Sequence, residues 1–466
     1  MSSNSSNNND NSIGNNREGN SGNNPGDNIR NNAENNPDIR YSYLIDNLNN
    51  DEINIRLGSL NQLHQLIEAG EILKPERGND VNNHIHTTYS FSPYSPTKAI
   101  WMAYSAGLVT AGIMDHDSIG GAEEFIEAGK YLNIATTIGV ECRADFSDTP
   151  LNGKKINNPD QSSIAYVALH GIPHTRINHV REYFTPYTRE RNKRNACMVD
   201  KINGLFKPFN IALDFEKDVA SISKVSDGGS ITERHILFAL AEKLVGRFGK
   251  GAALVDFLKN KMNISLKAKL EEYLLDSENQ FYEYDLLGVL KSDLISSIYM
   301  EAKKECPDIR ELLEFANTIG AISAYAYLGD VTNSVTGDKK TQKFEDDYIE
   351  QLFEVLKELG FNAVTYMPSR NTITQLKRVK ALCNRYDLLQ ISGEDINSPR
   401  QSFVCKAMRN DEFSNLIDST WALIGHEKAA TENIDDAMFS AKTIQKYGDL
   451  NERIAIYKEI GKSIGE

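Results

Sequence analysis

The stretch Val81–Gly107, VNNHIHTTYSFSPYSPTKAIWMAYSAG, predicts a strand, a turn and a helix in succession. Its first part, Val81–His86, is a short run that ends in ionisable residues. The helix is well signalled, because Ser95 can cap it, Pro96 suits its first turn and Gly107 can end it. Side chains in a strand alternate between faces, so the two histidines of the HIH triplet point the same way. The stretch therefore predicts a strand–helix unit that presents two imidazoles together where the strand ends.

Short apolar runs of this kind recur along the chain, and helical patterns lie between several of them. Strands that are apolar throughout are typical of parallel strands buried on both faces. Strand–helix alternation is typical of an α/β domain, either an open sheet or a closed barrel. The predicted strands are Val81–His86, Leu108–Asp115, Ile134–Glu141, Ile164–His170, Ile319–Tyr327, Phe361–Tyr366 and Leu388–Ser392. The predicted helices between them include Gly121–Tyr131, Thr341–Leu359 and Asn371–Tyr386.

Composition divides the chain into segments with different expected structures. Residues 1–40 are almost entirely Asn, Ser, Gly, Asp and Arg, which bury too little apolar surface to order, so we expect a disordered tail. Residues 41–80 predict a helical segment, with a helix near Asp51–Ala69. The α/β part is expected in two pieces, 81–181 and 308–410, on either side of a helical insertion at 182–307 that sits over the strand ends. In the insertion, Ser230 and Glu233 predict a capping box. Residues 411–466 predict C-terminal helices, including Asn433–Gly448 and Asn451–Gly461.

Charge and composition exclude several classes of function. The net charge is −14, from 51 basic and 65 acidic residues, without a dense basic block. Such a chain is unlike a sequence-independent nucleic-acid binder, although a short nucleotide could still be a substrate. No apolar run approaches the roughly 20 residues that cross a bilayer, and no secretory signal opens the chain. The five cysteines are scattered, so we expect a cytoplasmic protein without disulfides. The oligomeric state is not indicated.

Polar and ionisable residues follow most of the predicted strands. In parallel α/β folds functional side chains collect at the carboxyl ends of the strands, so these residues predict a ring of nitrogen and oxygen donors. Such donors suit Zn²⁺, Mn²⁺ or Fe²⁺. Taken singly, each has a structural explanation as well: a turn at residues 115–117, a Glu141–Arg143 pair, or hydrogen-bonded histidines such as His174 and His235. The residues are His84, His86, Asp115, His116, Asp117, Glu141, His170, Tyr327, Glu394, Asp395 and Asn397.

These motifs resemble the PHP family, named for its occurrence in polymerases and histidinol phosphatases. The resemblance covers about residues 82–400 and rests on His84-Ile85-His86, Met114-Asp115-His116, Gly139-Val140-Glu141 and His170. The segment Thr232–Ile236 is similar to one found in nucleotide-acting and RNA-trimming members. The resemblance implies a distorted (β/α)7 barrel with the helical insertion and a helical C-terminal extension. It also implies metal ions at the strand ends, one of them held by His84, His86, Glu141 and Asp395.

Three positions depart from the family pattern. Phe91 stands where an acidic residue or histidine is usual, Tyr327 replaces a histidine, and Asn397 replaces another. A second ion would share Glu141 and use His170, with Tyr327 as a replacement ligand. A third would rely on Phe91, His116 and Asn397, and phenylalanine cannot bind a metal. The resemblance therefore implies one or two divalent ions per chain.

The chemistry implied is hydrolysis of a small phosphate ester or nucleotide by a metal-bound hydroxide. His116 or Asp117 could assist proton transfer to the leaving group. Arg370 is the leading candidate to bind the phosphate, because a guanidinium can contact two oxygens at once, and Arg400 and Arg234 are weaker candidates.

Two alternatives stay open. Amidohydrolase barrels also begin with His-x-His and act on C–N bonds. Loss of several ligands would also suit a metal-binding or regulatory module without catalysis.

Overall fold

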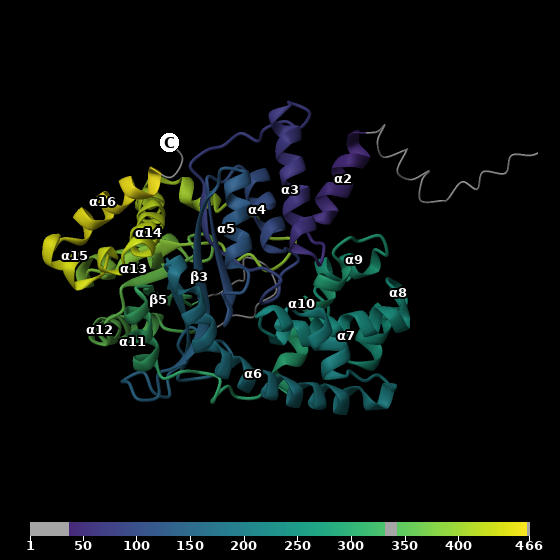
Figure 1. The fold of residues 1–466 in the computed structure, drawn as a ribbon. Helices are drawn as coiled ribbons and strands as arrows, with labels where there is room; N and C mark the ends of the chain where they lie inside the picture. Colours follow the sequence, from purple (N-terminus) through teal and green to yellow (C-terminus); the bar gives the residue numbers. More distant parts are fainter. Residues whose placement is uncertain (1–36, 331–342, 464–466) are drawn as a thin grey trace, which may run out of the picture.

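The computed structural model describes residues 37–330 and 343–463, which form an α/β barrel with added helices (Figure 1). Seven strands make one sheet whose order follows the chain. The predicted tail falls largely on residues 1–36, outside the described residues. All seven predicted strands are confirmed: β1 (Val81–Ile85), β2 (Thr110–His116), β3 (Ala135–Asp145), β4 (Ile164–His170), β5 (Ile322–Ala326), β6 (Ala363–Tyr366) and β7 (Leu389–Ser392).

One strand runs against the others, so the prediction of a wholly parallel sheet is wrong at β4. The pairs β1–β2, β2–β3, β5–β6 and β6–β7 are parallel, whereas β4 is antiparallel to both β3 and β5. Continuous apolar character reports burial on both faces and not direction, and β4 is nearly as buried as its neighbours. A parallel bridge between Ile85 and Ile396 brings the two edges together, so the sheet is a nearly closed, distorted barrel.

Helices surround the barrel and continue beyond it. The predicted helices near residues 53–68, 96–105, 122–131 and 373–386 are confirmed, while the predicted helix Asn433–Gly448 is divided into a 3-10 helix at Ile434–Asp436 and a short α-helix at Ala441–Lys446. Between β4 and β5 the longer elements are all helical, and those between residues 233 and 298 form the teal lobe at the right of Figure 1. The helices are α2 (Pro37–Asn47), α3 (Ile53–Glu68), α4 (Pro96–Ser105), α5 (Ala122–Tyr131), α6 (Ile177–Phe206), α7 (Glu233–Phe248), α8 (Ala252–Asp256), α9 (Ala268–Leu275), α10 (Tyr282–Ile298), α11 (Ile309–Ile319), α12 (Ile349–Leu359), α13 (Ile373–Tyr386), α14 (Ser414–Glu432), α15 (Ala441–Lys446) and α16 (Leu450–Lys462).

Two helix starts illustrate how local chemistry sets the fold. Ser95 accepts a hydrogen bond from the Lys98 amide at 3.0 Å, as its predicted capping role requires. The capping box of α7 is different from the predicted one: Thr232 is the cap and its backbone N–H donates to His235 Nδ1 at 3.0 Å. Glu233 instead contacts Arg143, Arg191 and Arg194. Contacts with residues so distant in the chain cannot be predicted from a local motif.

Helix α14 closes the barrel at the end where the strands of β5, β6 and β7 begin. Its Ala422 and Leu423 pack on inward-facing residues such as Ile322 and Ala363. Helix α16 packs tightly on α14, because a β-carbon at Gly425 would lie only 1.9 Å from the Tyr457 carbonyl oxygen. Larger residues at this crossing would push the two helices apart.

Contacts of Glu427 with Ile138 and His174 hold α14 against the barrel. The contact with His174 should make the stability of the fold depend on pH. Glu427 accepts hydrogen bonds from the Ile138 amide at 2.8 Å and from His174 Nε2 at 2.9 Å. Burial acts to lower the pKa of His174, but the hydrogen bond and charge of Glu427 outweigh it and raise the pKa. A raised pKa means that this contribution is complete below the unfolded pKa, about 6.5, and is lost as pH rises through the folded value. Thermal unfolding from pH 6 to 9 should show this loss in the wild type and a smaller one in His174→Gln. Equal pH dependence in both proteins would contradict a stabilising contact between His174 and Glu427.

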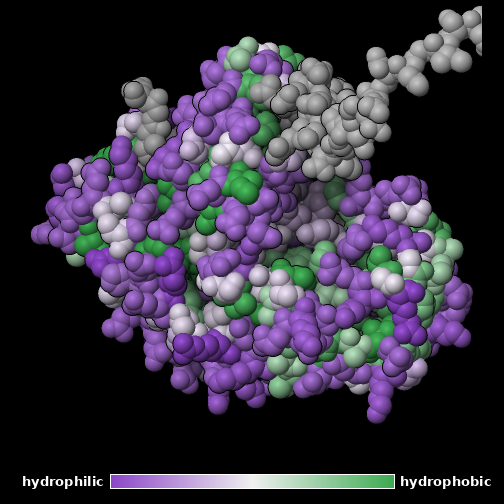
Figure 2. All heavy atoms as spheres, turned by 45° about the vertical axis from the view of Figure 1, so that its right-hand side comes forward, coloured by the Kyte–Doolittle hydropathy of each residue, from purple (hydrophilic) through white to green (hydrophobic). Residues whose placement is uncertain are grey.

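The insertion has its own hydrophobic core, separate from that of the barrel. Residues of α6, α7 and α10, such as Met198, Leu240 and Leu287, form this second cluster, and Phe91 from the loop after β1 joins it. Figure 2 shows a mainly hydrophilic face that is hollowed beside the lobe of the insertion. Among the described residues no helix has the length and apolar character to cross a bilayer.

Candidate metal centre

The closure of the barrel brings together three predicted ligands from the two ends of the sheet. The His86 amide donates to the Ile396 carbonyl at 2.9 Å, and the Ile396 amide donates to the His84 carbonyl at 3.1 Å. This bridge places Asp395 beside β1, and its Oδ1 lies 3.2 Å from His86 Nε2. His84 and His86 point to the same side, with ring centroids 5.0 Å apart. The His-x-His spacing therefore has the geometry that strand alternation predicts.

Strands β2 and β3 supply the next two groups. Glu141 and His116 are register partners, and Glu141 Oε2 lies 3.1 Å from His116 Nδ1. The same carboxylate oxygen lies 3.7 Å from His84 Nε2 and 3.9 Å from His86 Nε2. One carboxylate oxygen of Glu141 thus lies within 3.9 Å of ring nitrogens from three histidines, His84, His86 and His116.

The donor set fits a divalent metal ion. His84, His86 and Glu141 each offer one ligand atom within 4.8 Å of the others, and all three residues are buried. Imidazole nitrogen and carboxylate oxygen suit Zn²⁺, Mn²⁺ or Fe²⁺. His170, on β4, adds a further sign: its Nε2 is buried and has no hydrogen-bond partner among the described residues. Burying a ring nitrogen without a hydrogen-bond partner costs free energy unless a metal ion or another group binds the nitrogen.

The electrostatics of the cluster favour neutral imidazoles at two of its positions. Burial, and next the charge of His84, lower the pKa of His170 to about 3. Burial, and next the charge of His86, lower the pKa of His116 well below its ordinary value. Burial would raise the pKa of Asp395, but its contact with His86 holds that pKa well below the usual range. Neutral imidazoles and ionised carboxylates are the forms that bind metals.

Asp117, predicted to transfer protons, is engaged in a buried ion network. It adopts a left-handed backbone conformation with φ 50° and contacts Arg191 of α6. Arg143 contacts Glu233 at 3.3 Å and Glu305 instead of pairing with Glu141. The network ties the ends of β2 and β3 to the insertion, and its members are Asp117, Arg143, Arg191, Arg194, Glu233 and Glu305.

The remaining predicted residues make other contacts. The Tyr327 hydroxyl donates to Asp346 Oδ1 at 2.6 Å, and Asn397 Nδ2 donates to Asp395 Oδ1 at 2.6 Å, which orients that carboxylate. Arg370 Nε lies 3.3 Å from the Leu328 carbonyl oxygen. Tyr327 as a ligand and Arg370 as a phosphate-binding residue stay predictions.

Arg400 and Arg234 differ in what surrounds them. Arg400 contacts Asp285 of α10 through two nitrogens, each at 2.7 Å, and lies 3.9 Å above the Tyr273 ring. It joins the loop that carries Asp395 to the insertion. Arg234, near the start of α7, is close enough for its positive charge to help lower the pKa of Asp395.

Phe91, which stands where the resemblance implies a metal ligand, packs in the core of the insertion. Its ring packs edge-on against His235 at 5.0 Å and near Phe238 at 5.6 Å, within the core of the insertion. Its backbone has φ 136°, a conformation that is unfavourable for a side-chain-bearing residue. Phe91 is therefore a packing contact between the loop after β1 and the insertion.

Sequence reasoning missed the roles of Thr87 and Ser90. Both hydroxyls donate to Asp115, at 2.6 Å each, and Ser90 also contacts His86. The hydroxyl-rich sequence after the His-x-His motif was the available signal, but hydroxyls are common in turns and do not identify their partner.

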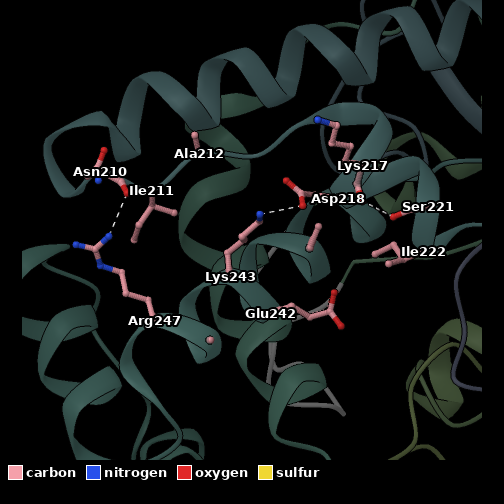
Figure 3. Close-up of a pocket in the computed structure, with 12 residues that line it drawn as sticks. Asn210, Ile211, Ala212, Lys217, Asp218, Ser221, Ile222, Glu242, Lys243 and Arg247 are labelled. Carbon is pink, nitrogen blue, oxygen red and sulfur yellow. Dashed lines mark hydrogen bonds and ion pairs between the residues drawn. The ribbon is translucent and has the colours of Figure 1, made fainter.

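A surface pocket of about 610 Å³ lies in the insertion and is separate from this cluster (Figure 3). Two of the three cations that line it are engaged locally: Lys243 contacts Asp218 at 2.9 Å and Arg247 donates to the Asn210 carbonyl at 3.0 Å. None of its lining residues is a predicted site residue.

Seven strands in a nearly closed barrel, with a potential metal site of histidines and carboxylates, define the class of architecture. No protein-family model matches the sequence, and no curated protein matches it significantly. One similar solved structure is a "putative metal-dependent phosphoesterase" from Bifidobacterium adolescentis, with 17% identity, a TM-score of 0.45 and coverage of 72% of this chain and 96% of that one. Another is an amidohydrolase from Chromobacterium violaceum, with 15% identity, a TM-score of 0.44 and coverage of 70% and 90%. Likeness at this level leaves the function of this chain to its own residues.

Proposed function

We propose that the chain is a metal-dependent hydrolase of the PHP type that cleaves a small phosphate ester or nucleotide. The observation that carries the proposal is that His84, His86 and Glu141 offer ligand atoms within 4.8 Å of one another, with Asp395, from the far edge of the sheet, in contact with His86. The choice of a phosphate ester rests on the motifs shared with the PHP family.

His84, His86, Glu141 and Asp395 would hold the tightest ion, and Glu141 and His170 would contribute to a second. A divalent ion in such a site supplies Lewis-acid polarisation of a phosphoryl oxygen and lowers the pKa of a bound water. From His84 to Asp395 the chain runs for about three hundred residues. Only the closure of the barrel therefore brings the four ligands together.

Around the ions, the chain itself would orient groups and move protons. His116 contacts Glu141 through Nδ1, which leaves Nε2 as the atom that accepts or donates a proton during the reaction. We assign proton transfer to His116 in preference to Asp117, because the Asp117 carboxylate is buried against Arg191. Arg234 and Arg370 are the candidates to bind substrate phosphate.

Activity assays test the proposal directly. The purified chain, stripped with a chelator and reloaded with Mn²⁺, Fe²⁺ or Zn²⁺, should hydrolyse members of a panel of sugar phosphates, nucleoside monophosphates and aryl phosphates. Chelation should abolish the activity and one of the ions should restore it. Turnover confined to amides or deaminase substrates would instead support a C–N hydrolase.

The alternative of a metal-binding module without catalysis also has an observation in its favour. Phe91 is committed to the insertion core and the Tyr327 hydroxyl to Asp346, at two positions where the family binds metal. A chain that binds its metal stoichiometrically but turns over nothing on the full panel would support this alternative and contradict the hydrolase.

A further inference from the structure

A continuous chain of hydrogen bonds connects a candidate metal ligand to a buried carboxylate. His86 Nδ1 lies 3.2 Å from Ser90 Oγ, and Ser90 Oγ lies 2.6 Å from Asp115 Oδ1. All three residues are almost completely buried. Asp115 also accepts hydrogen bonds from the Thr87 amide at 2.7 Å and from the Thr87 hydroxyl at 2.6 Å.

The direction of these hydrogen bonds follows from the donors that are present. An ionised carboxylate only accepts, and Asp115 accepts from Thr87 as well as from Ser90. Ser90 has one hydroxyl proton, so if it donates that proton to Asp115 its oxygen must accept from His86. His86 then carries its proton on Nδ1, which leaves Nε2, 3.2 Å from Asp395 Oδ1 and 3.9 Å from Glu141 Oε2, as the nitrogen that would bind an ion held between these carboxylates.

We propose that Ser90 and Asp115 are positioning residues for His86: they hold the ring in the Nδ1–H form, with Nε2 aimed at the metal. The proposal rests on the proposed function, because it assumes that Nε2 binds an ion. Outer partners of this kind fix the tautomer and the orientation of metal-binding histidines.

The arrangement uses both faces of the end of β2. His116 projects towards Glu141, and the preceding residue Asp115 therefore projects to the opposite face. There it holds the turn that follows β1, contacting Thr87 directly after His86 and Ser90 three residues later. One carboxylate thus secures both the backbone next to His86 and, through Ser90, the ring itself.

Ser92 provides a matched control on the same turn. It is buried like Ser90, but its hydroxyl has no hydrogen-bond partner among the described residues. Ser92→Ala and Ser90→Ala therefore remove the same atom from neighbouring positions, and only Ser90→Ala breaks the connection to His86.

Metal affinity, measured by competition with a chromogenic chelator, is the first test. Ser90→Ala should bind Mn²⁺ or Zn²⁺ about 10–100-fold more weakly than the wild type, which is the typical effect of losing an outer partner. Ser92→Ala should bind within about twofold of the wild type, a margin well below that effect. Equal affinity for Ser90→Ala and Ser92→Ala, with both folded by circular dichroism, would overturn the proposal.

The tautomer of His86 is the second test, and it is measured on the wild-type ring with the ion bound. Long-range nitrogen–proton correlation spectra of the Zn²⁺-loaded chain, with His86 assigned by comparison with His86→Gln, should show its proton on Nδ1. A proton on Nε2 would overturn the proposal. If the wild type binds no ion, the proposed function fails and this proposal fails with it, whereas a bound ion with the His86 proton on Nε2 overturns this proposal alone.

Discussion

Replacing His84 or Asp395 by alanine is expected to remove the tightest metal ion and abolish hydrolysis. Each variant deletes a ligand from a cluster in which Asp395 Oδ1 lies 3.2 Å from His86 Nε2 and Glu141 Oε2 lies 3.7 Å from His84 Nε2. Losing an outer partner of a ligand typically costs about 10–100-fold in metal affinity, so losing a ligand should cost more. Elemental analysis after gel filtration and kcat/KM on the best phosphate ester measure the two effects.

The matched control is His179→Ala, which removes an exposed histidine from α6. It should retain the metal content and activity of the wild type. A His84→Ala protein with full metal content, or an Asp395→Ala protein with wild-type activity, would show that these residues do not hold the catalytic ion.

The largest effect on stability is expected for Arg56→Ala. Arg56 is 2% exposed and joins α3 to α5, donating from Nε to Glu124 Oε1 at 2.7 Å. It also donates to the carbonyl of Asn50 at 2.6 Å, while Glu124 accepts from the Thr97 hydroxyl at 2.6 Å. Removing one partner leaves the other charge buried and unpaired, which typically costs about 3–5 kcal/mol. Urea unfolding should show this loss in the free energy of unfolding.

Two further variants separate burial of a charge from loss of an ion pair. The double variant Arg56→Met/Glu124→Leu removes both charges and should recover part of the lost stability, because no unpaired charge remains. Glu68→Ala breaks an ion pair with Lys74 that is exposed on both sides, and should barely move the unfolding midpoint. An Arg56→Ala protein as stable as Glu68→Ala would contradict the account of this contact.

The fold was largely predictable because its signals are local. Each strand is a short apolar run, and helix starts such as Ser95-Pro96 carry their own caps. The reversal of β4 was not predictable from these signals, since strands buried on both faces look alike in either direction. The cap of α7 was misassigned for a related reason: Glu233 is held by arginines from β3 and α6, and such tertiary contacts override a local motif.

The candidate site was predictable where ligands follow strand ends and less so elsewhere. His84, His86, Glu141 and Asp395 lie together as the His-x-His spacing and the family motifs imply. The partners of Asp117 and Tyr327, which are Arg191 and Asp346, come from distant helical segments that no motif connects to the strands. The role of Ser90 depends on the exact path of one turn, which composition does not specify.

The most direct test is the position of the metal in crystals grown with Zn²⁺, seen by anomalous scattering. The account predicts a peak about 2.0–2.2 Å from Nε2 of His84 and His86, with carboxylate oxygens of Glu141 and Asp395 at similar distances. No peak at that point in crystals saturated with the ion, or a peak bound only by other residues, would contradict it.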